Sequence, residues 1–325
     1  FRPTVRLGEG KFHRLKVTLR QKGLHVSARA GYYETRAYRT LNPLERSLLT
    51  ADVINGGGAR GEIPVGALAI PLAGSGIARV PVLIQVPASS LQDSKHSGRV
   101  RIAIYVYLTD ADGGLADYFS RNLTIDLARE GARLSAGYLR YSGACRLLPG
   151  RYTLRALVQD EETGRYGFAN ASVNVPDYSG TRLQAFPPLF LGDEGRGLNL
   201  REPSSGGGGE EIFELGGAPF VPQIDPPIPA SGDSKICLFV YRPHGDGDRP
   251  FDVDVEILGD DGKSRAPARV ALIGRTTADT DGLTKLMLDF SVRDLPPGRY
   301  SLKVTVRDSR EKALESSSEA PFTVS

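Results

Sequence analysis

The sequence has little cysteine, no tryptophan and no long apolar run, and each absence narrows the class of protein. Its 325 residues include two cysteines, one methionine and no tryptophan. Two cysteines, Cys145 and Cys237, cannot build a disulfide framework. No stretch reaches the roughly 18 apolar residues that a membrane-spanning helix requires, so we expect no membrane span. We predict that both thiols are buried as small hydrophobic groups, with a bridge between two domains as the alternative.

Sequence motifs for catalysis and cofactor binding are also missing. The chain contains no Gly-x-Ser-x-Gly elbow, no Gly-x-x-x-x-Gly-Lys-Ser/Thr phosphate loop and no zinc-ligand spacing. Its four histidines, His13, His25, His96 and His244, are scattered. We therefore expect no enzymatic activity, no catalytic residues and no cofactor. The net charge of +3 gives no reason to expect nucleic-acid binding.

The charged residues are distributed unevenly along the chain. Residues 1–46 hold eleven Lys and Arg against three Glu, a net +8, and residues 193–235 hold eight acids against three bases, a net −5. Such blocks are usually solvated surface, but blocks of opposite sign can also meet within one chain or between copies. The interaction candidates in these two blocks are Arg14, Lys16, Arg20, Tyr32, Tyr33, Glu210, Glu211 and Glu214.

Apolar residues alternate with polar ones over several segments, which is typical of β-strands. Every second residue is apolar in residues 78–86, 100–108 and 284–293. Turn-forming sequences separate these segments, as at residues 110–114. Helical periodicity is weak, and one short helix is expected over residues 43–51. Short strands without βαβ alternation predict an all-β protein built from antiparallel sandwiches.

A repeat divides the chain into two similar halves. Residues 147–160 and 295–308 are identical at eight of fourteen positions, at an offset of 148 residues. In each copy a Pro-Gly turn leads into a strand that begins with tyrosine, which resembles the tyrosine corner of immunoglobulin-like sandwiches. The turn and strand positions of the repeat are Pro149, Gly150, Tyr152, Pro297, Gly298 and Tyr300. An offset close to one domain length predicts two related sandwiches.

These patterns predict tandem immunoglobulin- or fibronectin-III-like antiparallel β-sandwiches, preceded by a short β-strand segment. The predicted segment covers residues 1–37, the first sandwich residues 38–178 and the second sandwich residues 179–325. Residues 187–234 are rich in proline and glycine, and we predict that they form a loop region of the second sandwich.

The N-terminal segment carries a family resemblance. Residues 10–17, Gly-Lys-Phe-His-Arg-Leu-Lys-Val, and residues 23–33, which end in Arg-Ala-Gly-Tyr-Tyr, are similar to the junction after the A domain in bacterial secreted von Willebrand factor A-related (VWFA-related) domain proteins. The resemblance implies that residues 1–37 are a β-hairpin at the end of such a domain, which is cleaved or missing here. The Asp-x-Ser-x-Ser metal loop of the A domain does not occur, so metal-dependent adhesion is not implied. The resemblance implies an extracellular or cell-envelope setting and a non-enzymatic role.

Acidic turns and outward tyrosines provide two weaker candidate sites. Asp246 and Asp248 lie in a Gly-Asp-Gly-Asp sequence with the oxygen ligands that calcium takes, although the complete calcium-loop pattern is absent. Tyr105 and Tyr107 occupy the outward face of an expected strand. Tyrosines in such a place either bind carbohydrate or a partner, or are covered by a neighbouring domain.

The leading hypothesis is an exported, non-enzymatic structural or interaction protein. Its tandem sandwiches would mediate self-assembly, at a surface or in a filament, or contacts with envelope proteins. One alternative is a carbohydrate-binding or adhesion module assisted by calcium, and another is an accessory region of a larger secreted protein. The expected partner is a protein, either another copy or an envelope protein, with a glycan as the alternative.

Overall fold

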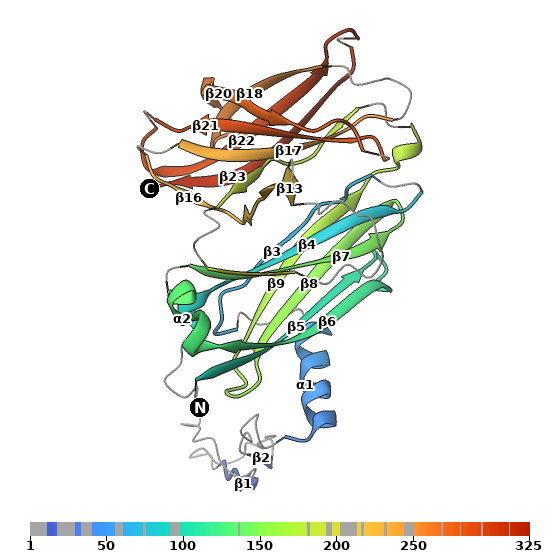
Figure 1. The fold of residues 1–325 in the computed structure, drawn as a ribbon. Helices are drawn as coiled ribbons and strands as arrows, with labels where there is room; N and C mark the ends of the chain where they lie inside the picture. Colours follow the sequence, from blue (N-terminus) through green and yellow to red (C-terminus); the bar gives the residue numbers. More distant parts are fainter. Residues whose placement is uncertain are drawn as a thin grey trace, which may run out of the picture.

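The computed structural model describes residues 12–17, 30–33, 41–55, 61–73, 76–91, 98–135, 137–180, 183–192, 197–201, 213–215, 218–230, 233–243, 250–267, 269–279, 281–293, 295–311 and 313–325. These residues form two β-sandwiches stacked end to end, with a hairpin and a helix at the N-terminal end (Figure 1). The predicted all-β class of antiparallel sandwiches is confirmed.

A hairpin and a helix precede the first sandwich. Strand β1 (Phe12–Arg14) pairs antiparallel with β2 (Gly31–Tyr33). Helix α1 (Pro43–Asn55) begins after Asn42, whose side chain accepts the Glu45 amide hydrogen while the Glu45 carboxylate accepts that of Asn42, both at 2.9 Å. This reciprocal capping box, with proline at the first helical position, fixes the start of the helix. The helix expected over residues 43–51 is present and extends to Asn55.

The first sandwich consists of two four-stranded sheets. One sheet has the order β12 (Leu198–Arg201), β7 (Tyr138–Leu147), β4 (Ala78–Pro87), β3 (Gly66–Ala69). The other has the order β6 (Leu115–Asp126), β5 (Arg99–Thr109), β8 (Gly150–Asp160), β9 (Tyr166–Val175). Short helices connect the strands: η2 (Ala88–Leu91), α2 (Leu127–Ser135) and η3 (Tyr178–Gly180).

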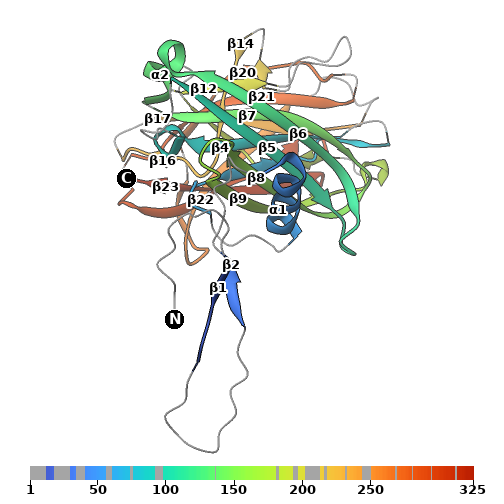
Figure 2. The same cartoon turned by 90° about the horizontal axis from the view of Figure 1, so that it is seen from below.

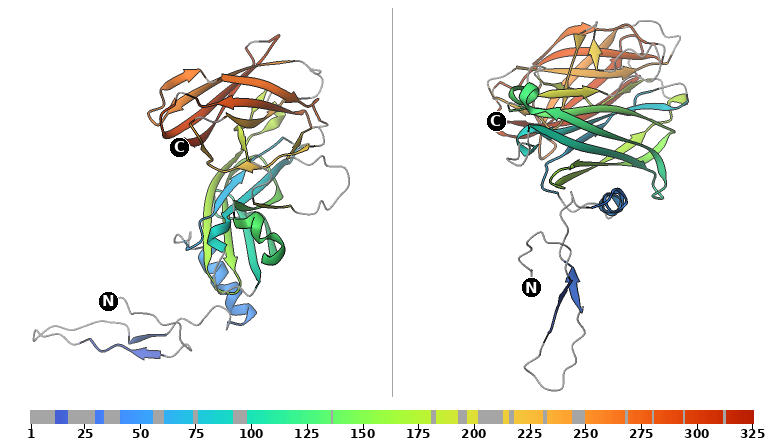
Figure 3. Two further views of the ribbon diagram at one scale, coloured as in Figure 1. Left: turned by 60° about the vertical axis from the view of Figure 1, so that its left-hand side comes forward. Right: turned by 60° about the horizontal axis from the view of Figure 1, so that its bottom comes forward.

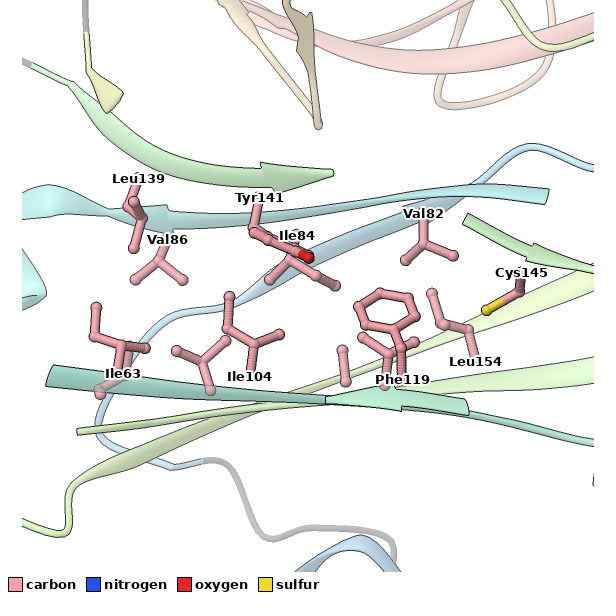
Figure 4. Close-up of a cluster of buried hydrophobic side chains, with 14 of the residues drawn as sticks. Ile63, Val82, Ile84, Val86, Ile104, Phe119, Leu139, Tyr141, Cys145 and Leu154 are labelled. Atoms are coloured by element: carbon pink, nitrogen blue, oxygen red, sulfur yellow. The ribbon is translucent and has the colours of Figure 1, made fainter. Parts of the chain in front are cut away.

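The core of the first sandwich lies between the inward faces of these sheets. Val82 and Ile84 of β4 point toward Ile104 of β5 and Leu154 of β8 (Figure 4). The alternating residues of 78–86 and 100–108 are buried as predicted, because every second side chain of a strand faces the same side.

The second sandwich also pairs two sheets. The first has the order β15 (Pro222–Gln223), β11 (Leu189–Leu191), β17 (Asp233–Tyr241), β21 (Leu283–Ser291), β20 (Arg269–Arg275), with β10 (Gln184–Ala185) also on β17. The second has the order β16 (Pro227–Ile228), β23 (Glu315–Val324), β22 (Gly298–Asp308), β18 (Phe251–Gly259), β19 (Ser264–Pro267). A separate hairpin joins β13 (Glu214–Leu215) to β14 (Ala218–Pro219).

The sequence repeat corresponds to β8 and β22, which occupy equivalent places in the two sandwiches. Each strand follows its Pro-Gly turn, Pro149-Gly150 or Pro297-Gly298. The Tyr152 hydroxyl donates to the Leu148 carbonyl at 2.9 Å, and the Tyr300 hydroxyl donates to the Pro296 carbonyl at 2.8 Å. The predicted tyrosine corner is therefore present in both sandwiches, and it ties each strand to the turn that begins it.

The chain crosses between the sandwiches more often than the sequence predicts. The predicted boundary between residues 178 and 179 assigns residues 198–201 to the second sandwich, but β12 pairs in parallel with β7 of the first. Leu198 of β12 is buried in the first core. The sequence-based boundary is therefore wrong for this strand, because its short alternating sequence, Leu-Asn-Leu-Arg, can indicate a strand but does not identify the strand's partner.

A separate apolar cluster fills the junction between the sandwiches. It combines residues of the β3–β4 connection with the outward face of β17 and β21 and with the aromatic residues that flank β13 and β14. Its members include Ile70, Leu72, Phe186, Phe213, Phe220, Phe239, Tyr241 and Met287. The first sandwich thus covers one face of the β17 sheet, and the second core covers the other.

Candidate functional site

The N-terminal hairpin is the first candidate interaction surface. Among the described residues, β1 and β2 pair only with each other, and both lie away from the sandwiches (Figures 2 and 3). Phe12 and Val17 are 49% and 53% exposed, and the side chains of Arg14 and Lys16 are exposed beside them. The hairpin therefore presents apolar and cationic side chains together, on a two-stranded sheet that no other described strand extends.

The other predicted interaction residues have different positions. In the hairpin backbone, Tyr32 is opposite His13 and Tyr33 is opposite Phe12. Glu214 lies in β13 at the junction of the sandwiches, far from the hairpin in Figure 1, and its carbonyl accepts a 2.8 Å hydrogen bond from the Lys285 ammonium. The remaining interaction candidates, Arg20, Glu210 and Glu211, and the calcium candidates Asp246 and Asp248 lie outside the described residues.

The outward tyrosines of β5 lie beside helix α1. The Arg155 guanidinium of the same sheet donates to the Ile54 carbonyl of the helix at 3.3 Å, and Ile54 is buried. Burial raises the pKa of Tyr105 and of Tyr107, with Glu161 and Tyr107 adding to the shift at Tyr105 and Tyr118 adding to it at Tyr107. The Tyr107 ring stacks against that of Tyr118 at 6.0 Å. Part of this face is thus covered from within the chain.

Strand β20 is the second candidate surface, and sequence reasoning missed it. It lies at the edge of its sheet and exposes three consecutive apolar residues, Ala271, Leu272 and Ile273, where its register with β21 shifts. The edge strands β15, β16 and β19 each contain proline, which prevents further pairing. Exposed apolar residues on an edge strand without proline favour the addition of another strand, and the irregularity between Leu272 and Gly274 interrupts this edge at one point.

A hollow between the sandwiches is the third candidate. Its volume is about 250 Å³. Its walls include residues of the turn before β8, the linker that follows β9, and the end of β17, namely Pro149, Pro176, Asp177, Tyr178, Ser179 and Tyr241. The Tyr178 and Tyr241 rings meet edge to face at 5.2 Å. Aromatic walls beside a carboxylate are suited to a cationic group.

The two cysteines are buried and unpaired, as the sequence predicts. Burial raises the pKa of both thiols to about 12, and Asp117 adds to the shift at Cys145 while Lys285 opposes it at Cys237. Such thiols are protonated at neutral pH and are poor nucleophiles. Within the described segments, no three His, Cys, Asp or Glu side chains come together as metal ligands.

No helix in the part of the chain that the structure describes is long and apolar enough to cross a membrane.

Comparison with known proteins identifies no family. No family model matches the chain, and no curated protein matches it. Solved structures that match include a family 123 glycoside hydrolase from Clostridium perfringens (TM-score 0.25, 7% identity, 31% of this chain and 22% of that chain) and red sea bream transglutaminase (TM-score 0.25, 8% identity, 86% and 34%). The chain thus spans about a fifth and a third of their lengths. The fibronectin(III)-like modules of Clostridium thermocellum CbhA also match (TM-score 0.21, 12% identity, 80% and 94%).

Proposed function

We propose that the chain is a non-enzymatic interaction protein that assembles with other copies of itself through the hairpin β1–β2. The observation that carries the proposal is the isolation of this hairpin, which pairs with no other strand among the described residues. An isolated two-stranded hairpin is marginally stable in water. Pairing with a further sheet would extend the hairpin and cover Phe12, Leu15 and Val17, which are exposed.

The edge of β20 is the acceptor that we propose on the second copy. Its seven residues contain no proline, and its exposed Leu272 and Ile273 match the apolar side chains of the hairpin. A donor and an acceptor at different places on one chain make a head-to-tail contact, which extends into a filament when the rotation between copies does not close a ring.

The setting that we propose is extracellular or on the cell envelope. The resemblance of residues 10–17 and 23–33 to the junction in VWFA-related proteins supports this setting and a role without catalysis. An envelope protein that supplies the acceptor edge is the alternative partner.

Sedimentation over a concentration series, with electron microscopy of the same sample, tests the proposal. We expect particles larger than the 35.0 kDa chain, and we expect deletion of residues 1–33 to abolish them. Ile273→Lys should weaken assembly and leave thermal stability unchanged, because the side chain is exposed. Leu115→Lys is the matched control, since Leu115 is also exposed, 55% against 47% for Ile273, but lies on a different strand. A monomer at every concentration contradicts self-assembly.

A further inference from the structure

Four side chains form one row across the outer face of the β6–β5–β8–β9 sheet. Tyr118 of β6 lies opposite Tyr107 of β5, and Tyr107 also lies opposite Arg155 of β8. Arg155 in turn lies opposite Asn170 of β9. All four point away from the core, because the alternate residues of these strands are the buried ones. With strands about 4.8 Å apart, the row is roughly 14 Å long, and we call it the Tyr–Arg row.

The two tyrosine rings of the row form an aromatic surface. Their centroids are 6.0 Å apart and their planes are inclined at 16°. Tyr118 is 59% exposed and Tyr107 is half-buried. A tyrosine ring combines a flat apolar face with a polar hydroxyl at its tip. A sugar ring has the complementary form, an apolar face of C–H groups with hydroxyls around its edge, so its apolar face packs well on these rings.

Helix α1 holds the arginine of the row in place. The Arg155 guanidinium donates to the Ile54 carbonyl near the end of the helix, at 3.3 Å. One turn earlier, the Thr50 hydroxyl donates to the Gln159 side chain, four residues further along β8, at 3.5 Å. The helix therefore follows β8 away from the row. A guanidinium that is already oriented loses less entropy on binding, and its planar fork matches a carboxylate or sulfate group.

The outward positions next to the row are polar and basic. Thr153 of β8 lies opposite Thr109 of β5 on one side and Ser172 of β9 on the other. Beyond them, Arg151 of β8 lies opposite Asn174 of β9, and both are exposed. Among these five described positions and the four of the row, two are arginine and none is Asp or Glu.

These groups favour one class of ligand. The two arginines attract an anionic group, and hydroxyl and amide side chains exchange hydrogen bonds with the hydroxyls of a sugar. Because serine is depleted in protein–protein interfaces, a face that combines tyrosine with serine, threonine and asparagine suits carbohydrate better than protein. The first acid beyond β5 is Asp110, whose carboxylate accepts the amide hydrogens of Asp112 and Gly114 within its own turn.

We propose that the Tyr–Arg row binds an acidic oligosaccharide. Sugar rings pack on Tyr107 and Tyr118, and the anionic group of the sugar pairs with the Arg155 guanidinium. A further sugar unit along the face reaches Arg151. The site lies on the first sandwich and includes neither the hairpin β1–β2 nor strand β20, so the inference does not depend on the proposed function.

Binding of the full chain to an array of oligosaccharides tests the proposal. The probes are oligosaccharides that carry uronic acid, sialic acid or sulfate, and the controls are their methyl-esterified or desulfated forms. We expect acidic probes to bind and their neutral forms to bind at least about tenfold more weakly, the size of one lost charge-assisted hydrogen bond. The carboxylated and sulfated probes distinguish the two sources of negative charge. Equal binding of acidic and neutral forms overturns the proposal, and so does the absence of binding by every acidic probe.

Two variants of one exposed tyrosine test the aromatic surface. We expect Tyr118→Ala to weaken binding of the acidic probe about tenfold, because it removes the ring on which the sugar packs. Tyr118→Phe keeps the ring and should retain most of the affinity. Both variants should leave the melting temperature unchanged, since the side chain is exposed. Unchanged affinity in Tyr118→Ala overturns the proposal.

Arginine variants test the charge selection. We expect Arg155→Gln and Arg151→Gln each to reduce the preference for the acidic probe over its neutral form about tenfold. Loosening of α1 in Arg155→Gln would not by itself change this preference, and Arg151 is exposed and provides a second reading. Arg299→Gln is the matched control, because Arg299 is the repeat equivalent of Arg151, is also exposed and lies on β22 of the second sandwich. A preference that persists in both Arg155→Gln and Arg151→Gln overturns the proposal.

Deletion of residues 1–33 separates this inference from the proposed function. The deletion removes the donor of self-assembly and should leave binding of the acidic probe unchanged. If the wild-type chain stays monomeric and binds the probe, the proposed self-assembly fails and the carbohydrate site stands. If Tyr118→Ala abolishes assembly while no acidic probe binds the wild type, the row is a contact between proteins, and the carbohydrate proposal is overturned.

Discussion

Arg242 and Asp308 form an ion pair inside the second sandwich, with the Arg242 Nη2 and Asp308 Oδ2 atoms 2.9 Å apart. Their side chains are 7% and 1% exposed. The Arg242 guanidinium also lies over the Phe251 ring, 4.0 Å from its centroid. The other carboxylate oxygen of Asp308 accepts the amide hydrogens of Arg310 and Glu311. Asp308 thus holds both a buried cation and the turn after β22.

Neutralising the Asp308 carboxylate should strongly destabilise the folded protein. We expect Asp308→Asn to lower the free energy of unfolding by about 3–5 kcal/mol, because it removes the charge of a carboxylate that pairs with a buried guanidinium. Asn keeps the size of the side chain and an oxygen for the turn, so the loss reports the charge. Urea unfolding, followed by tyrosine fluorescence, measures it.

An exposed pair of the same length provides the control. Arg293 and Asp233 are also 2.9 Å apart, but their side chains are 62% and 54% exposed. We expect Asp233→Asn to cost less than about 1 kcal/mol, because water screens the pair and solvates either charge alone. Equal costs for the two Asn variants would show that burial does not decide the strength of these pairs.

The tyrosine corners should contribute to stability through single hydrogen bonds. We expect Tyr300→Phe to destabilise the protein by about 1 kcal/mol, since it removes the hydroxyl that donates to the Pro296 carbonyl. Tyr152→Phe should cost less, because Tyr152 is only half-buried while Tyr300 is buried. Tyr118→Phe, on an exposed residue, is the control and should change the stability by less than about 0.5 kcal/mol.

The features that could be predicted from the sequence are the local ones. The Pro-Gly turn, the tyrosine four residues after the carbonyl that it binds, and the aspartate that ends the strand all lie within fourteen residues, so the repeat displays them together. The Arg242–Asp308 pair joins residues that are distant in the sequence and carries no local signal. The pairing of β12 with β7 could not be predicted from the sequence either, since β7 lies more than fifty residues earlier.

The candidate interaction surfaces show the same difference between local features and contacts of distant residues. The exposed cations Arg14 and Lys16 stood out as part of a basic block, whereas β20 and the hollow did not. The hollow needs four distant segments, which only the fold brings together. One signal was available for the junction: residues 236–241 are continuously apolar, and such a run indicates a strand covered on both faces.

The crossing of β12 should couple the stability of the two sandwiches. We expect Leu198→Ala to cost about 2–5 kcal/mol, because Leu198 is buried in the first core. Hydrogen exchange should speed up in β4 and β7 of the first sandwich, although residue 198 follows strands of the second in the sequence. Leu115→Ala, at an exposed position, is the control. Faster exchange confined to β21 and β22 would contradict the pairing.

The buried thiols should make stability depend on alkaline pH. Burial raises the pKa of Cys145 and Cys237 to about 12, above the usual 9.0. The folded state therefore keeps protons that the unfolded state releases, so this contribution to stability is complete below about pH 9 and is lost as the pH rises toward 12. Because the thiolate is the reactive form, the native protein at about pH 8 should resist a thiol-specific disulfide reagent, and both thiols should react once urea unfolds the chain. Cys237→Ala should reduce the loss of stability at alkaline pH relative to the wild type. Rapid labelling of the native protein would show that the thiols are accessible and would contradict the prediction.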